Sequence, residues 1–158
     1  MQMRWWTLSL ILGGLALTAG PVAAQPKEFP RYASVKKGEV NVRSGPGNQY
    51  PILWVYQWTG YPVQLLTRYD NYFKIRDVEG EEGWVYIGMV SGRQTGLVGG
   101  KHPVALYRDN NPASDVVARL APGVVVTLED TPCTGPYCEV EVDGTGGWVA
   151  KSVLLMVD

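Results

Sequence analysis

The 158-residue chain has little of what most enzymes and metal sites require. It contains one histidine, His102, in a run that is typical of a turn, and only two cysteines. A catalytic centre needs a nucleophile with a base, paired carboxylates in a cleft or a metal cluster, and these residues are too few for a zinc site. Glu79, Glu81 and Glu82 lie on a predicted hairpin tip, where charges are usually solvated. We therefore predict no catalytic residue, no bound metal and no cofactor.

The sequence also lacks a strong net charge, with 14 Lys and Arg against 15 Asp and Glu. Nucleic-acid binding relies on a basic surface, so no nucleic-acid partner is expected. The charges are unevenly divided, because residues 31–98 hold eight basic and six acidic residues, whereas residues 99–158 hold four and eight. We expect the two halves to present different electrostatic surfaces.

Long hydrophobic runs are confined to the N-terminus. Arg4 precedes an apolar run over residues 5–17, and small residues follow it. This order is typical of a signal peptide, predicted over residues 1–24 with cleavage between Ala24 and Gln25. A single membrane anchor is the alternative, but two glycines and a proline shorten the continuous apolar helix. We expect an exported protein that is not inserted stably in a membrane after cleavage.

Cysteine is scarce, and both cysteines lie close together, with four residues between Cys133 and Cys138. In an exported chain this spacing favours an intramolecular disulfide that closes a tight turn. The alternative is a redox pair or a catalytic thiol. It is disfavoured because the spacing is not that of a C-x-x-C motif and no helix N-terminus is expected nearby.

Helical periodicity is missing as well. After an irregular lead-in over residues 25–30, short apolar runs alternate with Gly, Pro, Asn and Asp, and this pattern predicts an all-β protein. The first half predicts strands near residues 32–35, 39–43, 52–57, 62–68, 72–77 and 83–86. The second half predicts strands near residues 95–98, 103–107, 116–119, 124–129, 137–142 and 147–149, and a terminal strand over 152–157.

What the chain does have is a repeat. Gly60 has a counterpart in Gly123 and Trp84 has one in Trp148, at almost the same offset along the sequence. A period of roughly 60 residues is too long for a solenoid and indicates two small domains in tandem, predicted over residues 31–93 and 94–158. Each is expected to fold as a small, bent β-barrel, which removes exposed strand edges. The short connector, residues 87–94, predicts that the two barrels pack together.

Aromatic residues are abundant and uneven, with eleven over residues 31–93 and three over residues 94–158. Alternation along a strand is expected to place Ile52, Trp54, Tyr56 and Trp58 on one face and Leu53, Val55 and Gln57 on the other. A small barrel has one inside, so some rings are expected outside, where they would form a recognition surface. The alternative is that most rings fill the barrel or the joint between the repeats.

Arg43 ends a predicted strand just before the loop Ser44-Gly45-Pro46-Gly47. It is a candidate for binding a ligand carboxylate, and the alternative is a structural brace to a loop carbonyl or to Asp70. The second repeat has Tyr107 at the aligned position and no matching glycine-rich loop. A site on this loop is therefore not duplicated.

These motifs resemble the bacterial SH3 (SH3b) family. The resemblance rests on Asn41-Val42-Arg43-Ser44-Gly45-Pro46-Gly47, Asn71-Tyr72-Phe73-Lys74-Ile75-Arg76 and Gly83-Trp84-Val85, and it covers residues 31–155. The double copy, with both cysteines in the second, is similar to tandem exported SH3-like proteins of Gram-negative bacteria. The resemblance implies two partly open SH3-like barrels, a periplasmic location and non-catalytic binding of peptidoglycan or its stem peptides beside the loop after Arg43. Tyr72 stands where the family often has tryptophan.

The predicted binding residues are those of the first repeat that carry rings or polar groups near this loop. They are Arg43, Ser44, Tyr56, Trp58, Tyr72 and Trp84. The rings would stack on a ligand while Arg43 pairs with a carboxylate. A second hypothesis is an envelope adaptor that docks a partner protein, because the sequence shows no wall-hydrolase domain beside the repeats and its halves differ in charge.

Overall fold

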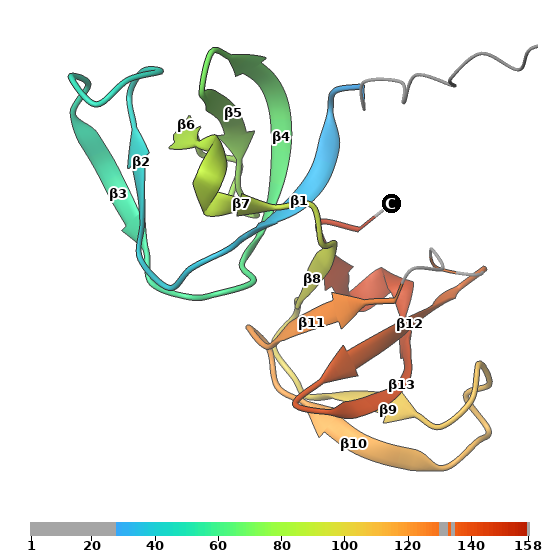
Figure 1. Ribbon diagram of the computed structural model, residues 1–158. Helices are drawn as coiled ribbons and strands as arrows, with labels where there is room; N and C mark the ends of the chain where they lie inside the picture. The colour runs from blue at the N-terminus through green and yellow to red at the C-terminus, as the bar shows by residue number, and fades with distance from the viewer. Residues whose placement is uncertain (1–27, 130–132, 134, 158) are drawn as a thin grey trace, which may run out of the picture.

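The computed structural model describes residues 28–129, 133 and 135–157 (Figure 1). The predicted signal peptide, its cleavage site at Ala24 and Gln25, and the first part of the lead-in lie outside these residues. Every regular element of the described chain is a β-strand or a short 3-10 helix, which confirms the all-β prediction. No helix in this part of the chain is long and apolar enough to cross a membrane.

The first seven strands form one antiparallel sheet that bends into a small barrel, at the upper left of Figure 1. The order of strands in the sheet is β3-β2-β6-β5-β4-β1-β7, so β3 and β7 are its edges. The strands are β1 (Arg31–Val35), β2 (Val40–Arg43), β3 (Ile52–Tyr56), β4 (Pro62–Tyr69), β5 (Tyr72–Arg76), β6 (Glu82–Tyr86) and β7 (Val90–Ser91), with the 3-10 helix η1 (Ile87–Met89) before β7.

The second seven strands repeat this topology in the order β10-β9-β13-β12-β11-β8-β14. The strands are β8 (Thr95–Val98), β9 (Val104–Tyr107), β10 (Val116–Leu120), β11 (Val125–Leu128), β12 (Tyr137–Val142), β13 (Thr145–Ala150) and β14 (Leu154–Leu155), with η2 (Lys151–Val153) before β14. Both sheets are antiparallel throughout, and the tandem-barrel prediction is confirmed.

The repeated glycines occupy equivalent turns in the two barrels. Gly60 and Gly123 have φ of 81° and 85°, a left-handed conformation that favours glycine. Their N–H groups donate to the carbonyl oxygens of Val35 and Val98, both at 2.7 Å. The recurrence of this glycine in the sequence therefore reflects one turn that is built twice.

The glycine of each Gly-Trp-Val motif allows two strands to cross closely. A Cβ added at Gly83 would collide with Val42, and one added at Gly147 would lie 2.6 Å from the carbonyl oxygen of Tyr107. Trp84 and Trp148 then pair with Arg43 and Tyr107 across the same crossing. The motif is thus a packing feature of the barrel.

Each barrel has its own core. Aliphatic side chains dominate both cores, and the first also contains the nearly buried ring of Tyr56. The most deeply buried residues of the first core are Ala33, Val42, Leu65 and Ile75, and those of the second are Leu106, Val126, Cys138, Val140 and Val149. The tandem sequence therefore builds two separate hydrophobic cores.

The barrels meet where β8 approaches β1 and β4. The hydroxyl of Thr95 donates to the carbonyl oxygen of Gly60 at 2.7 Å, and that of Ser34 donates to the carbonyl oxygen of Arg93 at 2.9 Å. Both hydroxyl-bearing residues are buried. The Thr95 bond therefore joins the two barrels directly, while the Ser34 bond holds the connector residue Arg93 against the first barrel.

The connector differs from the prediction. Residues 87–91 form η1 and the short strand β7, which pairs with β1, so only residues 92–94 link the two sheets. The predicted terminal strand over residues 152–157 is likewise shorter, because η2 precedes a two-residue strand. Elements of two or three residues are too short to give a hydrophobic period, and the sequence pattern does not reveal them.

A β-bulge also changes the predicted faces of β3. Trp54 pairs with Val42 and Ile52 pairs with Arg43, so Leu53 is the additional residue on the β3 side. A bulge breaks the alternation of side chains. Trp54 therefore faces the core, while Ile52 is exposed, and the prediction that they share a face is wrong.

The predicted disulfide is present in the second barrel. Cys133 and Cys138 are bonded, and their Cα atoms are 4.0 Å apart. Cys138 is fully buried in the core of this barrel. Disulfides are typical of proteins outside the cytoplasm, and this one is consistent with an extracytoplasmic location.

Candidate functional site

The outward face of β2 forms the floor of a cleft of about 270 Å³, which we call the Arg43 cleft. Alternation along the strand places Glu39, Asn41 and Arg43 on the same side. Val40 of β2 also lines the cleft, and the remaining lining residues come from the following loop, from β5 and β6 and from η1: Asn48, Tyr72, Tyr86 and Met89. Strands from three parts of the first repeat thus converge on one hollow.

Two tyrosines form the aromatic wall of this cleft. Tyr72, the first residue of β5, is directly opposite Tyr86, the last residue of β6, in the strand register. Their ring centroids are 5.9 Å apart in an edge-to-face arrangement. The Tyr72 hydroxyl donates to Oδ1 of Asn48 at 2.9 Å, which fixes the ring against the loop. Tyr86 is 47% exposed, so its ring is accessible to a ligand.

Arg43 braces the loop that bounds the cleft. Its Nη1 donates to the carbonyl oxygens of Asn48 and Tyr50, at 3.2 and 2.9 Å. This is the predicted structural alternative, and the partners are loop carbonyls and not Asp70. A guanidinium has five N–H donors, so two bonds leave three for a ligand. Arg43 can therefore brace the loop and still bind a carboxylate.

The structure does not bring the six predicted residues together. Arg43 and Tyr72 line the Arg43 cleft, whereas Tyr56 and Trp58 line a different hollow at one end of the barrel. Trp84 is half-buried opposite Arg43 in register and lines neither hollow, and Ser44 also lines neither. Alternation explains part of this division, because Tyr56 faces the core and Arg43 faces outward.

The cleft also contains residues that the sequence analysis missed, chiefly Glu39, Asn48 and Tyr86. Tyr86 lies two residues after Trp84 and so shares its strand face. Its pairing with Tyr72 depends on the length of the β5–β6 turn, which the sequence pattern does not set. A correct register for this hairpin would have identified Tyr86.

The residues that the structure describes were also compared with the geometry of metal sites. The described residues contain no group of three or more His, Cys, Asp and Glu side chains placed to hold an ion.

Comparison with sequence families gives a match to the family described as "Bacterial SH3 domain", over residues 36–92 and again over residues 100–155. The chain belongs to this family. The two bacterial SH3 domains match the two barrels in sequence order, and the predicted family is confirmed. No curated protein sequence matches the chain.

Two solved structures, those of NlpC2 and NlpC1 from Trichomonas vaginalis, align with this chain of two bacterial SH3 domains. Each is 13% identical to this chain, with TM-scores of 0.35 and 0.37. The alignments cover 82% and 90% of this chain but 49% and 51% of those proteins, so the chain spans about half their length.

Proposed function

We propose that the protein is a non-catalytic binding module of the bacterial envelope that recognises peptidoglycan, through its stem peptides, in the Arg43 cleft. The observation that carries this proposal is the combination of an acid, a base and two rings in one cleft. Family membership and the disulfide support a role in the cell envelope outside the cytoplasm, and we place the protein in the periplasm.

The chemistry of the cleft suits a short peptide with charged ends. Glu39 and Arg43 are four residues apart, so their Cα atoms are separated by about 13 Å along an extended strand. A ligand ammonium would pair with Glu39 and a ligand carboxylate with Arg43. The ring of Tyr86 would cover the apolar part of the ligand between them.

Binding to purified sacculi and to a soluble stem peptide tests this proposal. We expect the wild-type protein to sediment with sacculi, and the double variant Glu39→Gln, Tyr86→Ala to lose at least tenfold in affinity for both ligands. Both residues are exposed, so the variant should fold normally.

Tyr69→Ala is the matched control, because Tyr69 is 63% exposed and does not line the cleft. Wild-type protein that stays in solution with sacculi would contradict the function. A double variant that binds as tightly as wild type would contradict the site. Hydrolysis of a cell-wall substrate by the purified protein would contradict the non-catalytic role.

A second candidate function is an envelope adaptor. The edge strand β3 exposes apolar side chains, since Ile52, Leu53 and Val55 are 47%, 51% and 39% accessible. It pairs with β2 on one side only, and such an edge can add a strand from a partner. A photo-crosslinker at position 53 should then capture one defined periplasmic protein, and the absence of any reproducible product would count against this function.

A further inference from the structure

The hollow that contains Trp58 lies at one end of the first barrel, between β3 and the tip of the β5–β6 hairpin. We call it the Trp58 groove; its volume is about 340 Å³. Its aromatic wall is formed by Trp54, Tyr56, Trp58 and Tyr61. Asp77, Glu79 and Glu81 form the opposite rim. It shares no lining residue with the Arg43 cleft.

The rings of this wall are in contact with one another. Tyr56 and Tyr61 stack with centroids 5.0 Å apart, and Tyr61 is 6.1 Å from Trp58 with planes inclined by 31°. Burial falls along this series, from Tyr56 at 6% exposure to Trp58 at 68%. Trp58 is thus a large, accessible ring that packs on Tyr61 and extends a cluster of rings to the surface, and exposed apolar patches of this kind mark interaction sites.

The acidic rim is organised by a buried carboxylate. Oδ1 of Asp77 accepts hydrogen bonds from the backbone N–H groups of Glu79 and Glu81, both at 2.9 Å. Asp77 is only 8% exposed, whereas the other two side chains are exposed. The fixed turn therefore presents two carboxylates at the mouth of the groove above a third.

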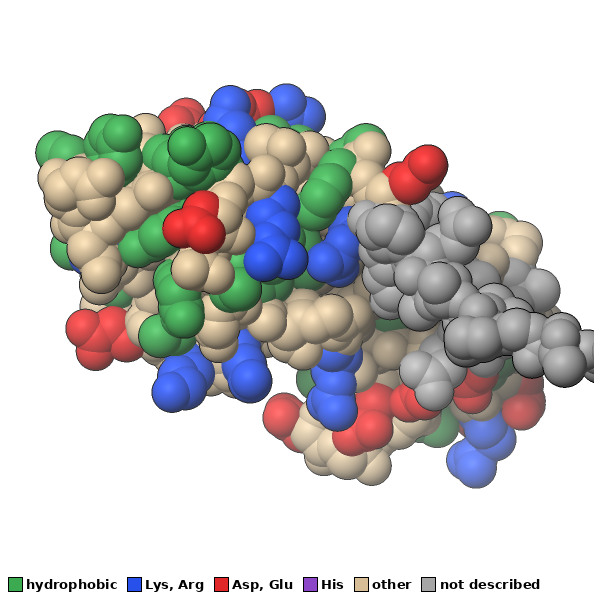
Figure 2. Space-filling model, turned by 45° about the horizontal axis from the view of Figure 1, so that its top comes forward, with side chains coloured by type: hydrophobic (Ala, Val, Ile, Leu, Met, Phe, Trp, Pro, Cys, Tyr) green, Lys and Arg blue, Asp and Glu red, His purple; other side chains and the backbone are tan. Residues whose placement is uncertain are grey.

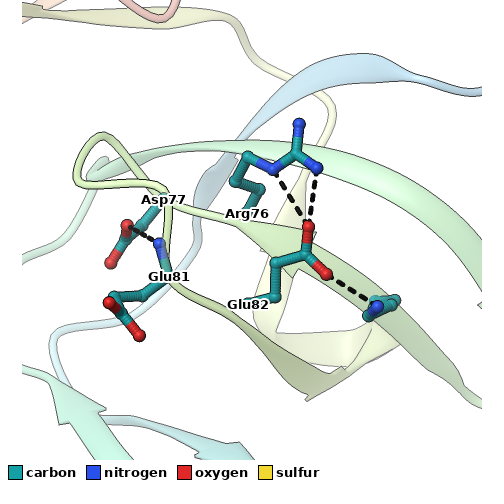
Figure 3. A network of polar contacts seen from close by, with 5 residues as sticks. Arg76, Asp77, Glu81 and Glu82 are labelled. Carbon is teal, nitrogen blue, oxygen red and sulfur yellow. Dashed lines mark hydrogen bonds and ion pairs between the residues drawn. The ribbon is translucent and has the colours of Figure 1, made fainter.

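Basic residues of the same hairpin do not neutralise this rim. Figure 3 shows Arg76 directed to Glu82, away from Asp77 and Glu81. The carboxylate of Glu82 accepts hydrogen bonds from Nζ of Lys74 at 2.7 Å and from Nη2 of Arg76 at 2.6 Å. These hydrogen bonds lower the pKa of Glu82, and the bond from Lys74 has the larger effect. Within the described chain, no ion pair involves Asp77, Glu79 or Glu81. The groove therefore keeps three carboxylates that no ion pair neutralises, of which Asp77 is hydrogen-bonded within the protein and Glu79 and Glu81 are exposed.

The carboxylates of the rim affect the nearby ring of Tyr61. Burial raises the pKa of Tyr61, and the charges of Asp77 and Glu79 raise it further. Aromatic faces are themselves electron-rich, and they attract cations that lie over them. Carboxylates on one side and ring faces on the other are the surroundings that a guanidinium or ammonium group prefers.

Beyond Trp58 the surface continues into a more apolar hollow of about 500 Å³. Val78, Leu97 and Val125 line it together with Trp58, Tyr61 and Glu79. An extended chain that crosses Trp58 could place a charged side chain on one side of the ring and an apolar side chain on the other. The two adjacent hollows suit a peptide with a charged and an apolar side chain, and together they are larger than a single small amine would fill.

We propose that the Trp58 groove binds a basic segment of a partner protein, in which an arginine or lysine side chain lies over Trp58 between Glu79 and Glu81 and an apolar neighbour occupies the adjacent hollow. This site is separate from the Arg43 cleft and does not depend on cell-wall binding there.

Peptide titrations of the full chain test the proposal. The probes are acetyl-Ala-Val-Arg-Val-Ala-amide, its lysine analogue and its citrulline analogue, in which the guanidinium is replaced by a neutral group of nearly the same shape. Binding is followed by ¹⁹F NMR of the protein labelled with 5-fluorotryptophan, through the Trp58 signal. We expect the arginine peptide to bind at least tenfold more tightly than the citrulline peptide, with an affinity that falls as salt increases.

The double variant Glu79→Gln, Glu81→Gln should lose at least tenfold in affinity for the arginine peptide. Asp109→Asn, Glu129→Gln is the matched control, because it removes the same charge from exposed residues of the second barrel. The control and Tyr86→Ala should both bind as wild type, and the latter result separates this groove from the Arg43 cleft.

Three outcomes would overturn the proposal. Equal binding of the arginine and citrulline peptides would show that charge is not recognised. An equal loss in the two double variants would show that only net charge matters. A Trp58 signal that responds to a stem peptide but not to the basic peptides would assign the groove to the cell wall instead.

Discussion

In the first barrel the β4–β5 turn is short and the β5–β6 turn is long. In the second barrel the equivalent β11–β12 connection is long and the β12–β13 turn is short. Tyr69 pairs with Tyr72, and five residues separate the pair Arg76 and Glu82. In the second barrel two residues, Asp143 and Gly144, form the corresponding hairpin tip. The repeat period is nearly kept because one loop lengthens while the other shortens. The acidic tip and the disulfide loop therefore occupy different ends of otherwise similar barrels.

The clefts differ for a related reason. Where the first barrel pairs Tyr72 with Tyr86, the second pairs Tyr137 with Ala150. Tyr107, in the position of Arg43, packs edge to face against Tyr137 at 6.1 Å. The first barrel thus has the guanidinium of Arg43 beside an aromatic cleft, whereas in the second barrel Tyr107 occupies this position and packs against Tyr137.

Surface composition follows the same division. Figure 2 shows hydrophobic side chains at the left, over the first barrel, and acidic side chains gathered toward the lower right. The exposed rings of the first barrel include Trp58, Tyr69 and Tyr86. Duplication has preserved the framework, while the surfaces available for binding have diverged.

The largest expected effect tests how closely the two frameworks correspond. A Cβ at Gly147 would meet the backbone oxygen of Tyr107, whereas one at Gly83 would first meet the side chain of Val42. Neither backbone nor a buried β-branched side chain yields readily, so Gly147→Ala and Gly83→Ala should each lower the free energy of unfolding of their own barrel by about 3 kcal/mol.

Urea unfolding followed by ¹⁹F NMR of 5-fluorotryptophan measures both, because Trp148 reports on the second barrel and Trp84 on the first. Gly146→Ala is the control, since no atom lies within 4 Å of its added Cβ. A loss at Gly146 as large as that at Gly147 would contradict the crossing argument.

The sequence was sufficient to predict this framework. Glycines at 60 and 123, and the Gly-Trp-Val motifs, mark backbone positions with strict steric requirements, so the barrels and their repeat could be predicted. The bulge at Leu53 could not, because strand alternation gives no sign of an additional residue. That one residue determines which side chains of β3 face outward.

The next largest effect concerns the disulfide, which only the second barrel has. Reduction should lower the free energy of unfolding of this barrel by about 2 kcal/mol, since the closed loop is short. The first barrel should be unchanged, so the Trp148 signal alone should move to lower urea concentration.

Cys133→Ala should reproduce this loss and abolish any further response to the reductant. If the Trp148 and Trp84 signals shifted equally to lower urea concentration, the two barrels would unfold together. The difference between the barrels would then not extend to their stability.

The binding site of the first repeat stays a prediction, and the sequence described its geometry incompletely. Sequence spacing placed the rings in the first barrel but could not show that Tyr56 packs into the core while Tyr72 lines the Arg43 cleft. Strand pairing decides this, and pairing depends on turn length and on the bulge. Glu79 and Glu81 were predicted to be solvated because they lie on a hairpin tip, and both side chains are exposed. The rings opposite them are distant along the chain, so the sequence did not indicate the groove.

The smallest expected effect is a pH response confined to the first barrel. Burial is the main cause that raises the pKa values of Tyr56 and Tyr61, and the charge of Asp77 raises both further. A phenol whose pKa is higher in the folded state contributes full stability below its unfolded pKa, near 10, and loses this contribution as pH rises. The free energy of unfolding of the first barrel should therefore fall above pH 10. Urea unfolding at pH 9 to 11.5 measures this through Trp84, and Tyr56→Phe, Tyr61→Phe should flatten the pH dependence relative to wild type. An unchanged slope in this variant would mean that other groups cause the alkaline loss.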